Sequence, residues 1–166
     1  DLPRVHVHLY KHIPTQAGMG GGSSDCAYMI RLLNDMFSLG MSDDKMIGYA
    51  ARLGADCAFF INSLPAYAEG IGEKLQPISL DLSGYKMLVV RPNIPVSTKE
   101  AFSLITPQIP KKNCLDVVMY EQGAVYAAMS GSGSSVFGLF HDTPDEKSFV
   151  GCMDELTVFT VDMSDI

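Results

Sequence analysis

The chain has 166 residues, of which 47% are hydrophobic and 19% charged, and its formal net charge is −7. This length and composition predict one globular domain or two small lobes with enough apolar residues for a core. The negative charge argues against a nucleic-acid binder, because such proteins neutralise phosphates with Lys and Arg. No apolar run approaches the roughly 20 residues of a membrane span, and we expect no signal peptide.

The cysteines of the chain are Cys26, Cys57, Cys114 and Cys152, and they form no C-x-x-C pair and match no zinc-site spacing. Cys26 and Cys57 lie among apolar neighbours and are expected to be small core residues. Free thiols of this kind are typical of a reducing compartment, so we expect a cytoplasmic protein whose partners are small molecules.

Apolar periodicity and turn residues divide the chain into a series of helices and strands. In chain order we expect a strand at 5–10, a helix over about 24–38 capped by Ser23 or Ser24, a helix over about 43–53 capped by Ser42, two short strands within 65–77, a strand at 85–90, a helix after Ser97 or Thr98, a helix at 115–122, strands at 124–129 and 136–140, a helix at 145–153 and a strand at 156–161. The second helix is expected to bury Ile47, Ala50, Ala51 and Leu53.

The chain is organised around its glycine-rich segment at 14–25, PTQAGMGGGSSD, which leads into the first expected helix. Glycine residues let this backbone turn sharply and approach a ligand closely. A glycine loop before a helix presents unpaired N–H groups and the positive end of the helix dipole, which together favour a phosphate. The segment lacks the lysine of a Walker A loop and the third glycine of a dinucleotide fingerprint. The alternative interpretation is a flexible Gly/Ser linker.

Two later segments place polar groups among apolar residues. Asp56 precedes the run CAFF at 57–60, and its carboxylate is either a turn group that bonds nearby backbone N–H groups or a group held beside a reacting centre. The segment SGSGS at 130–134 is either a hairpin turn or a second loop that lines a ligand with N–H groups and hydroxyls.

The glycine-rich segment resembles the phosphate-binding motif of the GHMP small-molecule kinases. Three further segments are similar to that family in the same order: LGADCAFF at 53–60, AYAEGIGE at 66–73 and AMSGSGSSVF at 128–137. The triple glycine followed by Ser-Ser-Asp is most similar to the branch that phosphorylates 4-diphosphocytidyl-2-C-methyl-D-erythritol in the non-mevalonate isoprenoid pathway. The similarity covers most of residues 5–140.

The resemblance implies an α+β, two-lobed GHMP kinase fold, with a partial ribosomal-S5-like lobe at 1–82 and a ferredoxin-like lobe at 83–166. A polar turn at 81–84 is the expected boundary between the lobes. The resemblance also implies an enzyme that uses ATP and Mg²⁺ to phosphorylate the 2-hydroxyl of this substrate, with neither a nucleic acid nor a membrane as partner.

The resemblance assigns three groups of residues. Asp56 matches the catalytic base, which takes the proton from the substrate hydroxyl. The ATP-binding segment corresponds to Pro14, Ala17, Gly18, Met19, Gly20, Gly21, Gly22, Ser23 and Ser24, and Ser24 also reaches the metal ion. The substrate end corresponds to Thr98, Phe102, Gly131, Ser132 and Gly133, and a plain core position is the alternative for Phe102.

The chain departs from the family pattern in three places. Ala58 stands where the family usually has proline. The family's catalytic lysine and a Gly-Tyr-His motif lie in a segment that precedes the counterpart of Asp1, and Lys11 is not that lysine. The family also has a longer stretch between Lys112 and Gly123. We therefore expect a truncated and internally shortened member, and two alternatives stay open: another GHMP kinase, for mevalonate-type or homoserine-type alcohols, or a nucleotide-binding protein without turnover.

Overall fold

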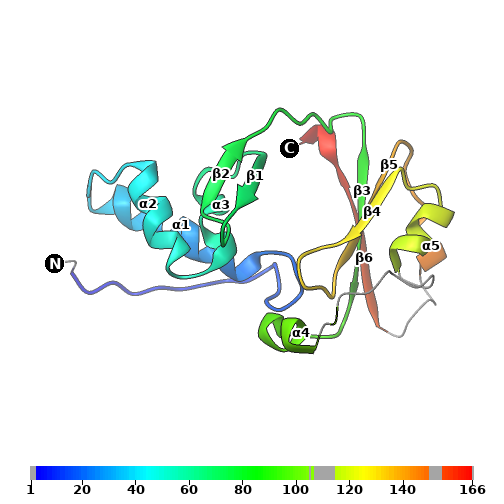
Figure 1. Ribbon diagram of the computed structural model, residues 1–166, viewed down its shortest axis with the longest axis horizontal. Coiled ribbons are helices and arrows are strands. Elements are labelled where there is room, and N and C mark those ends of the chain that lie inside the picture. The colour runs from blue at the N-terminus through cyan, green and yellow to red at the C-terminus, as the bar shows by residue number, and fades with distance from the viewer. Residues whose placement is uncertain (1–2, 105, 107–114, 150–154, 166) are drawn as a thin grey trace. The chain divides into compact units, whose positions relative to one another are not determined.

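The computed structural model describes residues 3–104, 106, 115–149 and 155–165 (Figure 1). The chain forms two compact units. Unit 1 consists of residues 1–14 and 20–80, and unit 2 consists of residues 15–19 and 81–166. Each unit has a hydrophobic core of its own. The glycine-rich segment is thereby divided between the units, while the lobe boundaries at 1–82 and 83–166 stay a prediction.

Unit 1 contains two α-helices of unequal length, α1 (Gly21–Met36) and α2 (Asp43–Ala51). Two short helices follow them, η1 (Ala55–Cys57) and α3 (Phe59–Asn62). All four elements contribute to one core. Its buried members are Ala27, Met46, Ala50, Cys57 and Ile61. The two alanines are completely buried, which lets the helix backbones approach one another closely.

Helix α2 begins as the sequence predicts. The hydroxyl of Ser42 accepts a hydrogen bond from the backbone N–H of Lys45 at 3.4 Å, and Asp43 and Asp44 lie in the first turn, near the positive end of the dipole. The expected buried position of Leu53 is wrong, because the helix ends at Ala51 and Leu53 lies beyond it with 66% of its surface exposed.

Helix α1 begins earlier than predicted, and the expected cap at Ser23 or Ser24 is wrong. The N-cap is Gly20, with φ 64° and ψ 11°, and no side chain caps the helix. Ser23 and Ser24 lie within the first turn, where the Ser24 hydroxyl donates to the carbonyl of Gly21 at 3.1 Å. Glycine adopts the left-handed conformation without strain and is nearly as good an N-cap as serine, so the helix can start at the glycines.

The predicted strand at 5–10 is also wrong. These residues pair with no strand in the part of the chain that the structure describes, and their apolar side chains are exposed, Val7 at 56% and Leu9 at 61%. Alternation indicates a face suited to burial, but a strand forms only where a second strand completes its hydrogen bonds.

The predicted hairpin is confirmed. Strands β1 (Ala66–Glu69) and β2 (Lys74–Pro77) are antiparallel, with Glu69 opposite Lys74 at the turn. Gly70 and Gly72 have positive φ values of 73° and 108°, which the turn requires. A Cβ on Gly72 would overlap the carbonyl oxygen of Ala55, so the turn lies directly against η1.

Unit 2 is a four-stranded antiparallel sheet in the order β4-β5-β3-β6. Its elements are β3 (Lys86–Pro92), α4 (Thr98–Leu104), α5 (Leu115–Glu121), β4 (Tyr126–Met129), β5 (Val136–Phe140), η2 (Glu146–Phe149), β6 (Leu156–Asp162) and η3 (Met163–Asp165). This is the βαββαβ element order of a ferredoxin-like fold, with a short 3₁₀ helix in the second helical place.

The core of unit 2 lies between one face of the sheet and α5 (Figure 1). Leu88 and Val90 of the central strand are fully buried there, together with Met119 of α5 and Phe149 of η2. The predicted strands of this unit are confirmed, and the central strands β3 and β5 are nearly continuous buried runs rather than alternating ones.

Two predictions for unit 2 need correction or lie outside the description. The helix expected at 145–153 is the 3₁₀ helix η2, whose first turn is held by the Asp145 carboxylate accepting from the Lys147 N–H at 3.0 Å. Residues 150–154, the end of that expected helix, lie outside the described residues, as do residues 107–114. Within the described ranges, no helix has the length and apolar character needed to cross a membrane.

Candidate functional site

The first turn of α1 presents free backbone donors. The first helical hydrogen bond runs from the Ser24 N–H to the carbonyl of Gly20 at 2.8 Å, so the N–H groups of Gly21, Gly22 and Ser23 have no acceptor within the helix. No side chain caps this end, and its first turn holds no acidic residue. The positive end of the helix dipole is therefore left for an anion.

The glycines of this turn differ in what surrounds them. A Cβ on Gly20 would come within 2.7 Å of the Phe60 ring, and one on Gly21 within 2.8 Å of the Ile13 side chain. A Cβ on Gly22 would meet no atom within 4 Å. Packing within the protein thus requires glycine at 20 and 21, whereas Gly22 faces open space through which a ligand can approach the helix end.

Lys11 is a residue whose role the sequence did not reveal. Its ammonium group donates to the carbonyl of Gly21 at 3.1 Å and forms an ion pair with the carboxylate of Asp25. These bonds fasten the segment before the glycines onto the first turns of α1 and bring a cation to that end of the helix. The two partners are 14 residues apart and follow no local pattern, so only the folded chain shows the pair.

The other half of the glycine-rich segment belongs to unit 2. Gly18 has a φ of 71°, and a Cβ there would overlap the carbonyl oxygen of Ser130. The Ser130 hydroxyl donates to the Gly18 carbonyl at 2.7 Å, and the Ser135 N–H donates to the Ala17 carbonyl at 3.2 Å. The segment at 130–135 joins the antiparallel strands β4 and β5, as the hairpin interpretation predicts, and it also holds Ala17 and Gly18 in place. Its role in lining a ligand stays a prediction.

The predicted substrate residues lie in unit 2, and two of them are in contact. The hydroxyls of Thr98 and Ser132 are 3.0 Å apart, which joins the start of α4 to the second glycine loop. A Cβ built on Gly131 would lie 3.7 Å from the Cα and carbonyl oxygen of Gly18. The N–H of Gly133 donates to the Ser130 carbonyl at 3.0 Å. The side chain of Phe102 lies outside the described part of the structure.

Ser135, at the end of this loop, combines a buried hydroxyl with a fully paired backbone. Ser135 is fully buried, and its Oγ has no hydrogen-bond partner among the residues that the structure describes. Its backbone is well paired, since it accepts from the Ser130 N–H at 2.8 Å while donating to Ala17. A buried hydroxyl without a hydrogen bond is costly, so Ser135 is a polar group that the packing of this loop does not account for.

Asp56 lies on the short helix η1 in unit 1, and its side chain is exposed. Its neighbours Cys57 and Ala58 are buried, at 4% and 0% exposure, so the turn is fixed from beneath. Among the described residues, no group hydrogen-bonds or ion-pairs with the Asp56 carboxylate. That result disfavours the alternative of a turn aspartate that bonds local N–H groups, and it leaves the carboxylate free to accept a proton.

The hairpin turn fixes the same helix from the other side. Gly72 rests on Ala55, next to Asp56. The carboxylate of Glu73 accepts from the Ile71 N–H at 2.8 Å. Hydrogen bonds from the backbone N–H groups of Glu73 itself and of Ile71 lower the pKa of the Glu73 carboxyl. Asp56 thus projects from a backbone that is held by both its core neighbours and the hairpin.

Cys26 and Cys57 are core residues, as predicted. Cys57 is buried, and Cys26 is partly buried beside it. Burial raises the pKa of the Cys26 thiol, and the neighbouring Cys57 raises it further. Both effects disfavour the Cys26 thiolate, so Cys26 is not suited to act as a nucleophile. Cys114 and Cys152 lie outside the described residues.

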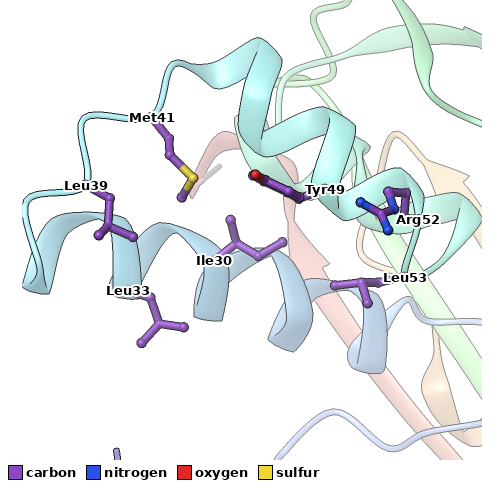
Figure 2. Close-up of a pocket in the computed structure, with 7 residues that line it drawn as sticks. All are labelled: Ile30, Leu33, Leu39, Met41, Tyr49, Arg52 and Leu53. Atoms are coloured by element: carbon purple, nitrogen blue, oxygen red, sulfur yellow. The ribbon is translucent and has the colours of Figure 1, made fainter. Parts of the chain in front are cut away.

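An apolar groove of about 450 Å³ lies between α1 and α2 (Figure 2). Figure 2 shows side chains from both helices around it, and its lining consists of Ile30, Leu33, Leu39, Met41, Tyr49, Arg52 and Leu53. The groove contains none of the predicted site residues. It also lacks the converging donors that a phosphate needs, so it is not the anion site at the end of α1.

Comparison with known proteins identifies both parts of the chain. The family model described as the GHMP kinases N terminal domain matches residues 2–63, and the one described as GHMP kinases C terminal matches residues 112–155. A solved crystal structure of 4-(cytidine 5'-diphospho)-2C-methyl-D-erythritol kinase superposes with a TM-score of 0.62 at 24% identity, covering 90% of this chain and 68% of that one. These matches confirm the predicted α+β, two-lobed kinase fold.

Curated relatives are similar over most of the chain. A Bacteroides fragilis protein named 4-diphosphocytidyl-2-C-methyl-D-erythritol kinase is 47% identical over 179 residues, covering 89% of this chain. A protein of the same name from Porphyromonas gingivalis is 33% identical, covering 92% of this chain and 69% of the relative. The chain spans 65% of the length of the B. fragilis relative.

The packing around the glycines makes opposite predictions for two alanine substitutions. Gly18→Ala should lower the free energy of unfolding by about 2 kcal/mol or more, because a left-handed residue gains a Cβ against the Ser130 carbonyl. Gly22→Ala should leave it unchanged or raise it by about 0.5–1 kcal/mol, because alanine favours the helix and meets no atom. Urea unfolding of the two variants checks this, and equal effects would contradict the described packing.

Proposed function

The chain belongs to the GHMP kinase family, and on that premise we propose that it transfers the γ-phosphoryl group of ATP to the 2-hydroxyl of 4-diphosphocytidyl-2-C-methyl-D-erythritol. The observation that carries the proposal is the uncapped end of α1, which lies in the same unit as the unpaired carboxylate of Asp56. The names of the curated relatives support the choice of substrate. The reaction belongs to isoprenoid precursor synthesis, and we place it in the cytoplasm.

We assign the phosphates of ATP to the first turn of α1. The N–H groups of Gly21, Gly22 and Ser23 supply donors, and the helix dipole supplies a partial positive charge. Pro14, Ala17, Gly18, Met19 and Gly20 shape the segment that leads to these donors. The Lys11 ammonium lies beside the same turn, where the carboxylate of Asp25 balances its charge. Phosphoryl transfer depends mainly on such positioning and charge stabilisation.

Asp56 is assigned as the general base. A base must be free to accept the proton of the attacking hydroxyl and must be held in a fixed place. The carboxylate of Asp56 has no partner among the described residues, and its backbone is fixed by Cys57, Ala58 and the hairpin turn at Gly72. These properties support an orienting and proton-accepting role.

Mg²⁺ fits this site only with most of its ligands supplied by the nucleotide. The described residues contain no group of three or more His, Cys, Asp or Glu side chains that could hold a metal ion. Ser24 donates its proton to the Gly21 carbonyl, which leaves its oxygen lone pairs available to the ion. Ser24 is the residue that would hold Mg²⁺ from the protein side, and the ion would offset the negative charge of the phosphates.

The substrate is assigned to unit 2 residues on the second glycine loop and at the start of α4. Thr98 and Ser132 offer two adjoining hydroxyls, and the exposed Gly131 leaves the loop backbone accessible at their side. Gly133 is buried, with its N–H bonded to the Ser130 carbonyl, so it shapes the loop from within. Phe102 remains the proposed stacking partner of the cytosine ring. The negative net charge supports a small-molecule substrate over a nucleic acid.

A second function has one observation in its favour. No cation pairs with Asp56 among the described residues, and Lys11 is engaged by Asp25. A protein that binds nucleotide without turnover would have the same cradle with an incomplete catalytic centre. ATP-dependent stabilisation without ADP formation distinguishes this function from the kinase.

Substitution of the proposed base should separate chemistry from binding. Asp56→Asn keeps the size of the side chain but removes its ability to accept the proton, so turnover should fall by about 10²-fold or more. The affinity for ATP should stay within about twofold, because the phosphates are held on α1. Coupled ADP-release kinetics and calorimetry measure the two quantities. The matched control is Asp44→Asn, an exposed carboxylate on α2 that should leave turnover unchanged, and a fully active Asp56→Asn would refute the role of base.

A carboxylate at position 22 should act on stability and binding in opposite directions. Gly22→Asp places a negative charge at the positive end of α1 and should raise the free energy of unfolding by about 0.3–1 kcal/mol. The same charge should weaken Mg-ADP binding by about tenfold or more, since it occupies the anion site and repels phosphate. Gly22→Asn is the uncharged control of equal size and should lose less affinity. Unaltered binding by the Asp variant would remove this helix end from the nucleotide site.

A further inference from the structure

We propose that Phe60 is a positioning residue for the reaction: its ring, seated against Gly20, couples the turn that carries Asp56 to the uncapped end of α1. This inference rests on the proposed kinase function. All the groups that carry it belong to unit 1.

The contact between Gly20 and Phe60 is close and specific. An ideal Cβ on Gly20 would come within 2.7 Å of the ring Cζ and 2.9 Å of Cε2. Gly20 is also the left-handed N-cap residue of α1. The ring therefore covers the point where the backbone turns into the helix, next to the N–H groups proposed to bind phosphate.

Asp56 and Phe60 follow one another on a continuous helical path. Helix η1 is closed by the Cys57 N–H donating to the Gly54 carbonyl at 3.1 Å, and Ala58 has helical angles of −59° and −41°. The Ile61 N–H then donates to the Ala58 carbonyl at 3.3 Å as α3 begins. Residues four apart on such a path are about one turn apart, so the positions of the ring and the carboxylate are tied to each other.

Phe60 is partly buried and has further contacts within unit 1. Its ring meets that of Phe59 edge to face, with centroids 5.1 Å apart and planes at 80°. It also packs against the core of unit 1. The Arg31 guanidinium of α1 donates to the Ile61 carbonyl at 3.2 Å, which adds a second tie between α1 and α3. The ring is thus a rigid spacer between two fixed backbones.

The consequence is a specific kinetic signature. The phosphate donors belong to α1 and remain in place when the ring is made smaller. What changes is the distance between those donors and the carboxylate of Asp56. A misplacement of about 1 Å can lower the rate by about 10²-fold, so loss of the ring should reduce kcat far more than nucleotide affinity.

The matched pair Phe60→Leu and Phe149→Leu tests this signature on the 166-residue chain. Phe149 is a fully buried phenylalanine in the core of unit 2, whereas Phe60 is partly buried, so Phe149→Leu removes at least as much packing without touching Gly20. Phe60→Leu should lower kcat at least about tenfold, with the KM for ATP within about threefold, whereas Phe149→Leu should keep kcat within about twofold of the wild type. Equal kcat in the two variants would overturn the proposal.

A double-mutant cycle tests the contact itself through unfolding equilibria. Gly20→Ala should raise the equilibrium constant of unfolding in both backgrounds. The rise should be about fivefold smaller in the Phe60→Leu background than in the wild type, because the smaller side chain no longer meets the new methyl group. In the Phe149→Leu background the effect of Gly20→Ala should equal that in the wild type. Additive effects in both backgrounds would show that the ring does not bear on Gly20 and would overturn the proposal.

These measurements separate the two claims. A wild-type chain that binds no Mg-ATP overturns the proposed function and, with it, any role of Phe60 in the reaction. A wild-type chain that turns over while Phe60→Leu does so equally well overturns only the inference about Phe60.

Discussion

The left-handed conformation of Gly20 is the constraint on which the site depends. It starts α1 two residues before the serines and leaves the helix without a side-chain cap. The absent Cβ admits the ring of Phe60, so the same residue joins the end of α1 to the helical path that follows Asp56. A larger residue would lose both properties, since a left-handed φ is strained and the ring would be displaced.

The glycine-rich segment is divided between the two units and is fixed separately in each. Gly18 is fixed in unit 2 by the carbonyl and hydroxyl of Ser130, while Gly20 and Gly21 are packed within unit 1 against Phe60 and Ile13. A Cβ on Gly22 would meet no atom within 4 Å, so packing does not require glycine there and ligand binding is the better explanation for it. The second glycine loop therefore has a structural role, because Ser130 and Ser135 fix the backbone of Ala17 and Gly18 in the first glycine-rich segment.

Local pattern predicted the fold better than it predicted the site. The strands of unit 2, the hairpin before it and the Ser42 cap are encoded by neighbouring residues and were predictable. The strand at 5–10 was not, because pairing depends on a partner outside the pattern. The Lys11–Asp25 ion pair and the contact of Phe60 with Gly20 join residues far apart in the chain, and nothing in the local sequence marks them. Asp56 was found by resemblance, and the structure adds that its carboxylate has no partner among the described residues.

The most direct test of the account is ADP release by this chain in the presence of Mg-ATP and 4-diphosphocytidyl-2-C-methyl-D-erythritol, with homoserine as the competing alcohol. The account predicts release that requires the diphosphocytidyl substrate and does not occur with homoserine. A folded chain that binds Mg-ATP but releases no ADP with this substrate would contradict the kinase assignment, and release with homoserine alone would contradict the choice of substrate.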